Sequence, residues 1–236
     1  MTAITAYING EIHTQDKSRP RAEAVLVRDG IVVAVGSNDE VLGSGEHEAL
    51  NGERSRARRP RIEHSEIPSE ADVARYAIIG AIASFQPSMI YPKDEWLGME
   101  GVWQTRVGDD AMTRAFPIRS IKEAGGAIAF GTDWPIVNLN PLLGIRKAVL
   151  RKSIDNQPVS GWVEPQAISI EEAVEAYTLG AAYAGHREEH EGSISPGKFA
   201  DLIVLSGNPF KCEPDQLPTL RVEATIVNGE LVNGKL

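Results

Sequence analysis

Hydrophobic and polar positions change their pattern twice along the chain, and each pattern predicts a different kind of structure. Short β-branched runs come first, at Ala24–Val27 and Ile31–Val35, and the Asp29-Gly30 turn between them predicts an antiparallel hairpin. A polar, Arg-rich stretch with weak periodicity then fills residues 41–60. Beyond residue 61, apolar strands alternate with amphipathic helices, which is typical of parallel β/α units.

The β/α block predicts a fixed order of elements. Helix starts are marked by Ser69 and Ser169, each followed by acidic residues that favour the first turn of a helix. Gly125-Gly126 predicts a helix end. The expected elements are a strand ending at His64, helix 69–79, strand 81–85, helix 110–124 interrupted by Pro117, strand 127–130, helix 141–152 and helix 169–183.

The chain ends as it begins, in short strands. Strands are expected over Gly192–Ile194 and Asp201–Leu205, and an Asn228-Gly229 turn predicts a last hairpin between Ala224–Val227 and Glu230–Val232. The same turn signal, Asn9-Gly10, closes the first expected strand, Ala6–Asn9. Two strand segments around a β/α block predict one composite sheet built from both ends of the chain.

Composition and charge narrow the class of protein. The chain has 236 residues with 42% hydrophobic residues and a formal charge of -9, which predicts a globular protein and disfavours nucleic-acid binding. The basic run Arg54–Arg61 is expected to be a solvated helix end. We expect neither a membrane span nor a secretory signal, since no apolar run is long enough. The single cysteine, Cys212, fits a reducing cytoplasm.

Three polar side chains directly follow expected strands, where β/α enzymes place their active sites. His64 ends the first strand, and neutral imidazole is the commonest metal ligand, although a lone histidine is more often structural. Asp133 follows strand 127–130, where a carboxylate ligates a metal, accepts a proton from water or merely caps a turn. Gln86 follows strand 81–85 and either offers its amide to a substrate or starts a loop.

The order of these strand ends resembles the amidohydrolase superfamily, and more narrowly the amidohydrolase 3 family, which includes D-aminoacylase-like and N-substituted formamide deformylase-like enzymes. The matching segments are YINGEIHTQD, AEAVLVRDGIVVAVGSNDEVL, RRPRIEHSE, IASFQPS, AGGAIAFGTDWPIVNLNPLLGI, EEAVEAYTLGAAYA and GSISPGKFADLIVLSGNPF. The resemblance implies an α/β fold. Residues 61–190 would form strands six to eight of a TIM-type (β/α) barrel, residues 1–40 and 191–236 a small composite β-sandwich, and residues 41–60 a linker or deletion junction.

The resemblance also implies roles for individual residues. In the family a divalent metal, usually zinc, polarises a carbonyl and lowers the pKa of a water. His64 would be the strand-six metal ligand, and Asp133 would take the proton of the water and pass it to the departing nitrogen. Gln86, Arg106 and Trp134 would contact a small amide-type substrate.

Several family features are missing from the sequence. None of the five histidines forms a strand His-x-His pair, no bridging acid or strand-five histidine is visible, and Met89 stands where relatives often have histidine. Zinc catalysis uses about three protein ligands, and three β/α units cannot close an eight-stranded barrel. Open sheet edges would favour self-association into a homo-oligomer.

Three hypotheses follow. The chain is a metal-dependent hydrolase of non-peptide carbon–nitrogen bonds, such as those of amides or formamides, and is truncated and weakly active or inactive. Alternatively, it is a non-catalytic remnant that acts as a binding or interaction module. The third hypothesis is a gene with an internal deletion, whose intact relative is the working enzyme. The sequence leaves the substrate, the number of metal ions and the oligomeric state open.

Overall fold

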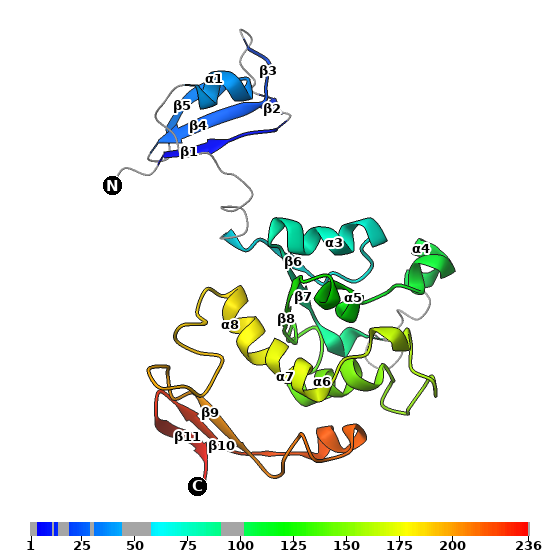
Figure 1. The fold of residues 1–236 in the computed structure, drawn as a ribbon. Coiled ribbons are helices and arrows are strands. Elements are labelled where there is room, and N and C mark those ends of the chain that lie inside the picture. The colour runs from blue at the N-terminus through cyan, green and yellow to red at the C-terminus, as the bar shows by residue number, and fades with distance from the viewer. Residues whose placement is uncertain are drawn as a thin grey trace. The chain divides into compact units, whose positions relative to one another are not determined.

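The computed structural model describes residues 4–10, 12–13, 19–28, 31–43, 58–90 and 102–235. The chain divides into two compact units, Met1–Arg58 and Arg59–Leu236. Figure 1 shows small antiparallel strands in the first unit, and helices around a short parallel sheet in the second. The predicted division into four segments is finer than these two units and stays a prediction.

The N-terminal unit is built on a three-stranded antiparallel sheet with the strand order β1-β4-β5. Its small core contains Ala6, Ala24, Leu26 and Val41. Ser37 caps the short helix α1 in a capping box with Glu40, as the Ser-x-x-Glu spacing favours. The elements are β1 (Ile4–Tyr7), β2 (Ile12–His13), β3 (Arg21–Ala22), β4 (Ala24–Arg28), β5 (Ile31–Gly36) and α1 (Asn38–Leu42).

One of the two hairpins predicted here is confirmed and the other is wrong. Strands β4 and β5 pair antiparallel, as expected. The Asn9-Gly10 pair does not close a hairpin, because β1 pairs with β4 while β2 pairs with β3. Asn9 has a left-handed backbone (φ 61°), and its N–H donates to Asn38 Oδ1 at 2.8 Å. The turn therefore directs the chain out of the sheet.

The C-terminal unit contains the predicted parallel β/α block. Strands β6 (Arg61–Glu63), β7 (Ile82–Phe85) and β8 (Ala127–Phe130) form a parallel sheet in that order. Helices follow each strand, and a buried cluster that includes Phe85 and Phe130 packs between sheet and helices. These helices are α3 (Glu70–Ile79), η1 (Pro87–Met89), α4 (Val102–Met112), α5 (Ile118–Glu123) and α6 (Pro141–Leu150).

Local sequence explains where α3 begins and ends. Ser69 caps it by accepting from Asp72 N, and Gly80 ends it with a left-handed backbone (φ 65°). Tyr76, on its inner face, is buried in the core. The predicted helix 69–79 is thereby confirmed, and helix 141–152 is confirmed as the slightly shorter α6.

The interruption predicted at Pro117 in helix 110–124 is confirmed, but it separates two helices with different bounds from those expected. Helix α4 ends at Met112 and α5 begins only at Ile118. Between them, Phe116 has a left-handed backbone (φ 50°) and donates its N–H to the carbonyl of Glu66 at 2.6 Å. Pro117 has no N–H for a helical bond. The buried Phe116 ring instead packs against Phe85, with centroids 6.4 Å apart.

The helix predicted over residues 169–183 is confirmed, with a π-helical turn in its middle. It comprises α7 (Ile170–Glu175), the π turn η4 (Ala176–Gly180) and α8 (Ala181–Ala184). Ser169 and Glu172 form a capping box at its start. A Cβ at Gly180 would lie 2.4 Å from the carbonyl oxygen of Ile128, so only glycine permits this close approach to β8.

The last segment forms a separate antiparallel sheet, β11-β10-β9, with strands β9 (Leu202–Leu205), β10 (Val222–Val227) and β11 (Glu230–Gly234). The Asn228-Gly229 hairpin is confirmed. The strand predicted at Gly192–Ile194 is wrong, because Gly192 turns (φ 85°) where a Cβ would lie 2.8 Å from Ala182 Cβ. Short 3₁₀ turns lie at η3 (Glu164–Gln166) and η5 (Pro214–Thr219).

One composite sheet built from both ends of the chain stays a prediction. The described strands of the first and last segments each pair within a sheet of their own segment. A β-sandwich made of both sheets stays a prediction.

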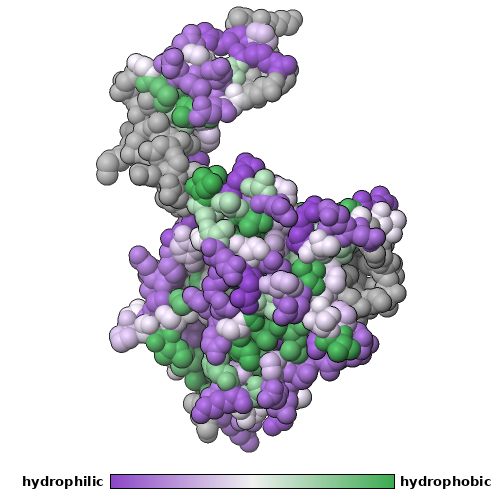
Figure 2. Space-filling view, turned by 45° about the vertical axis from the view of Figure 1, so that its right-hand side comes forward, coloured by the Kyte–Doolittle hydropathy of each residue, from purple (hydrophilic) through white to green (hydrophobic). Residues whose placement is uncertain are grey.

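Figure 2 shows hydrophobic residues gathered in patches between polar areas on the face it displays.

Candidate functional site

His64 and Asp133 face each other at one end of the parallel sheet. His64 follows β6 and Asp133 lies three residues beyond β8, both at the carboxyl ends of their strands. His64 Nε2 and Asp133 Oδ2 are 3.9 Å apart, and both side chains are partly exposed, at 46% and 37%. Strand β7 lies between the two strands, so their backbones are about 10 Å apart. Both side chains therefore reach over the end of β7.

The backbone at both residues is held in an unusual conformation. His64, Ser65 and Asp133 have positive φ angles of 68°, 44° and 60°. Such angles are uncommon for residues other than glycine and persist where surrounding contacts fix them. Ser65 Oγ donates to the carbonyl of Ile62 at 2.8 Å, and the buried Tyr76 hydroxyl donates to Ser65 Oγ at 3.0 Å. Helix α3 thus fixes the turn that directs the imidazole toward Asp133.

Glu66 lies on the other side of the imidazole and was missed in the sequence. Its Oε1 is 3.7 Å from His64 Nδ1, a contact longer than a hydrogen bond. Burial raises the pKa of Glu66 to about 7. A carboxyl beside Nδ1 that leaves Nε2 open is the usual setting of a metal-binding histidine. The segment RIEHSE contained this signal, since it places a carboxylate two residues after His64.

Gln86 lies directly after β7, between the two strands that carry His64 and Asp133. Gln86 is only 6% exposed, and its Oε1 has no hydrogen-bond partner among the described residues. Ser88 Oγ, two residues on, is also buried without a partner among them. A buried acceptor left unpaired is costly. Both unpaired atoms therefore lie just beyond the carboxyl end of β7.

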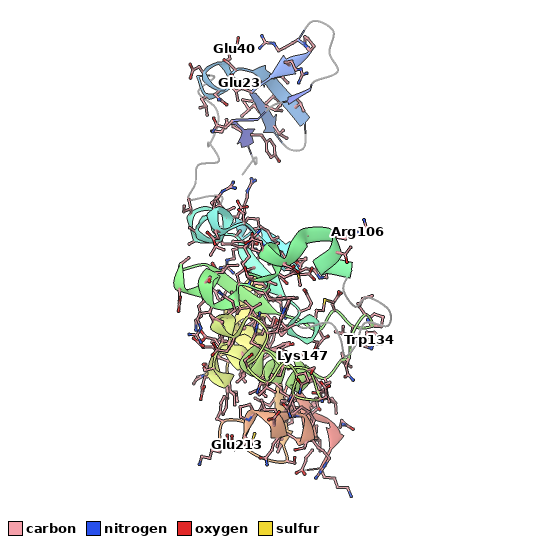
Figure 3. All side chains as sticks on the ribbon, turned by 90° about the vertical axis from the view of Figure 1, so that its right-hand side faces the viewer. Glu23, Glu40, Arg106, Trp134, Lys147 and Glu213 are labelled. Carbon is pink, nitrogen blue, oxygen red and sulfur yellow. The ribbon has the colours of Figure 1, made fainter. Side chains whose placement is uncertain are left out.

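The structure places Arg106 and Trp134 on different elements. Arg106 lies exposed on α4, and Trp134 directly follows Asp133 with 64% of its surface exposed. Figure 3 shows both residues on the right of the view, with Arg106 well above Trp134. Trp134 is thus adjacent to the His64–Asp133 pair through the chain, and no ion pair joins Arg106 to that pair in the described residues.

The remaining histidines and Met89 lie outside this pair. His190 stacks on Phe199 with centroids 5.7 Å apart. Met89 is buried in the core. The side chain of His13 and the whole of His47 are outside the described residues. Residues 54–57 of the basic run 54–61 are also outside them, and within the described half Arg59 pairs with Glu188.

The described residues fit a metal ion only in part. In the ranges that the structure describes, no three His, Cys, Asp or Glu side chains are arranged to hold one ion. His64 and Asp133 supply one imidazole nitrogen and one carboxylate, which suit zinc, but a catalytic zinc uses three protein ligands. The pair alone therefore does not supply the ligand set of a catalytic metal site. No helix in the described part of the chain is long and apolar enough to cross a membrane.

Comparison with known proteins supports the family resemblance that the residues at the strand ends suggested. The model of the "Amidohydrolase family" matches residues 32–233. The putative amidohydrolase YtcJ of Bacillus subtilis (strain 168) is 33% identical over 198 residues, which is 84% of this chain and 35% of that protein. The N-substituted formamide deformylase of Arthrobacter pascens is 31% identical over 172 residues, which is 72% of this chain and 30% of that protein.

A solved structure shows the same fold. An uncharacterised metal-dependent hydrolase from Pyrococcus horikoshii OT3 aligns with a TM-score of 0.56 and 24% identity, covering 66% of this chain and 30% of that one. The chain thus spans about a third of the length of the proteins it matches.

Proposed function

This chain belongs to the amidohydrolase family, and from that premise we propose that it carries part of a metal-dependent hydrolase of non-peptide carbon–nitrogen bonds, such as those of amides and formamides. One observation carries the proposal. His64 and Asp133 come from strands separated by β7, and yet their side chains approach to 3.9 Å at the strand ends. In β/α folds the carboxyl ends of the strands are where active sites form.

Each residue of the site has a role in this proposal. His64 Nε2 and the Asp133 carboxylate would hold a divalent ion, zinc being the first choice for this pair of donors. The ion, when bound, supplies Lewis-acid polarisation of a carbonyl. Asp133 accepts a proton from the attacking water and returns it to the departing nitrogen. Gln86 Oε1 accepts a substrate N–H, and Arg106 and Trp134 contact the rest of a small amide-type substrate.

The described site supports weak activity or none for this chain alone. Two donors hold an ion less firmly than three, and the chain spans about a third of its relatives' length. The alternative, a non-catalytic remnant that acts as a binding or interaction module, is favoured by the same incomplete donor set. An internal deletion in the gene would produce either outcome.

We also propose the finer details of fold, assembly and location. Strands β6 to β8 would be strands six to eight of a TIM-type barrel, with the two terminal sheets forming a small β-sandwich. Ile62 on β6 is 45% exposed, which supports self-association through this strand into a homo-oligomer. The single Cys212, partly buried and free, supports a cytoplasmic location.

Replacing Asp133 with asparagine tests the proposed reaction. With zinc and N-butylformamide, we expect the full chain to release formate slowly. Asp133→Asn should reduce that rate by about 10²-fold or more, because the amide cannot accept the proton. Asp110→Asn is the matched control, since its side chain is 97% exposed on α4 and its loss should leave the rate unchanged. Absence of zinc-stimulated release, or equal rates for Asp133→Asn and the parent chain, would favour the remnant.

A further inference from the structure

The loop after Asp133 exposes a row of apolar side chains beside the candidate site. Trp134, Ile136 and Leu139 are 64%, 59% and 63% exposed. Together with Pro135, Val137 and Asn138 they line an open hollow of about 530 Å³. Small-molecule sites commonly have volumes of about 300–1,000 Å³. The hollow is thus large enough for a substituent of the size of a butyl chain or a ring.

Hydrogen bonds and one core contact fix the shape of this loop. The N–H of Ile136 donates to the carbonyl of Asp133 at 2.8 Å and closes a turn. Val137 is 6% exposed and packs in the core. Asn138 Oδ1 accepts from the N–H of Asn140 at 2.8 Å, and Asn140 caps α6. Because the backbone is anchored on both sides of Val137, the neighbouring apolar side chains are presented outward by the fold.

Core packing does not account for the exposed side chains of this loop. Val137 alone in the row Trp134–Leu139 is buried, whereas Trp134, Ile136 and Leu139 each expose more than half of their surface. Grouped exposed apolar residues commonly mark a binding site. Here the group begins at Trp134, the residue that follows Asp133 in the chain, so the exposed apolar row starts at the candidate site.

We propose that Trp134, Ile136 and Leu139 form a specificity surface for an apolar substituent of the amide substrate. The proposal rests on the proposed function for where the amide lies, and it adds the class of substrate: amides with an alkyl or aryl substituent rather than a charged or hydroxylated one. The tryptophan face supplies the broadest apolar contact of the three.

Two probes of matched length test this surface without metal or turnover. N-Butylformamide and N-(3-hydroxypropyl)formamide differ by a methyl group in place of a hydroxyl. In ligand-observed NMR titrations of the metal-free full chain, we expect N-butylformamide to bind about five- to ten-fold more tightly. Trp134→Ala and Ile136→Ser should each reduce this ratio to near one. Both residues are exposed, so unchanged thermal unfolding is expected for both variants.

Val159→Ser is the matched control for this test. Val159 is 74% exposed and lies beyond the far end of α6, a helix of about 15 Å, so its loss should leave the ratio unchanged. Equal affinity for the two probes would overturn the proposal. A preference that survives Trp134→Ala and Ile136→Ser, or that Val159→Ser abolishes, would overturn it too. Since the titration needs no hydrolysis, an inactive chain that keeps the preference refutes only the proposed reaction.

Discussion

Replacing Arg151 with methionine is expected to lower the free energy of unfolding of the chain by about 3–5 kcal/mol. Arg151 is fully buried. Its guanidinium donates to the carbonyls of Ala115, Phe116 and Trp162 at 2.9, 3.3 and 3.0 Å. Methionine fills similar space but donates nothing, so these three hydrogen bonds would be lost.

The three carbonyls explain why this effect should be large. They belong to the break between α4 and α5 and to the segment before η3, so one side chain joins two loops to the end of α6. Burial lowers the pKa of Arg151 to about 9, which still leaves it charged at pH 7. Methionine also keeps a Cβ at the left-handed Arg151 backbone (φ 55°), so backbone strain is unchanged.

Urea unfolding at pH 7 measures this loss. The control is Arg75→Met, which removes an exposed i,i+3 ion pair with Asp72 and should cost less than about 1 kcal/mol. A similar small cost for Arg151→Met would show that the loops keep their shape without the buried guanidinium.

Replacing Glu66 with glutamine is expected to stabilise the chain at pH 8 and to leave its stability at pH 4 nearly unchanged. Burial raises the pKa of Glu66 from 4.5 to about 7. The folded state therefore holds the proton more tightly than the unfolded state. The stabilisation that this proton gives the folded state is fully present below pH 4.5 and is lost as the pH rises through 7. A pKa shift of this size corresponds to a loss of up to about 3 kcal/mol in the free energy of unfolding.

Thermal and urea unfolding from pH 4 to pH 8 separate the contribution of Glu66 to stability from the contributions of the other carboxylates. The difference between Glu66→Gln and the parent chain should grow with pH over this window, because glutamine does not ionise. Glu63→Gln is the neighbouring control, since the Glu63 side chain is 47% exposed in an ion pair with Arg61. A pH-independent difference for Glu66→Gln would mean that Glu66 is ionised in the folded state at pH 5.

Local signals predicted the helix ends and the parallel order of strands correctly. The Ser69 and Ser169 caps and the β-branched runs act within a few residues, so the sequence contains them. Pro117 predicted an interruption of helix 110–124, but the left-handed turn at Phe116 was missed because it depends on a hydrogen bond to Glu66, some 50 residues away. The bend at Gly192 depends on contact with Ala182 in the preceding helix. Tertiary contacts of this kind leave no local pattern.

The candidate site was predicted in its two main residues but not in its support. His64 follows β6 directly and Asp133 lies three residues beyond β8, and parallel pairing places such residues at one end of a sheet. Glu66 lies in the same segment, but only burial reveals its raised pKa. The support of the His64 turn by Tyr76 depends on how α3 packs, which the sequence spacing alone does not determine.

Zinc titration of the full chain by calorimetry most directly tests the central claim, that His64 and Asp133 share one ion site. We expect weak zinc binding that His64→Ala and Asp133→Ala each weaken by at least ~10-fold. His190→Ala should leave the affinity unchanged, because His190 stacks on Phe199. Wild-type affinity in His64→Ala, or loss of binding in His190→Ala, would contradict the assignment of the metal to this pair.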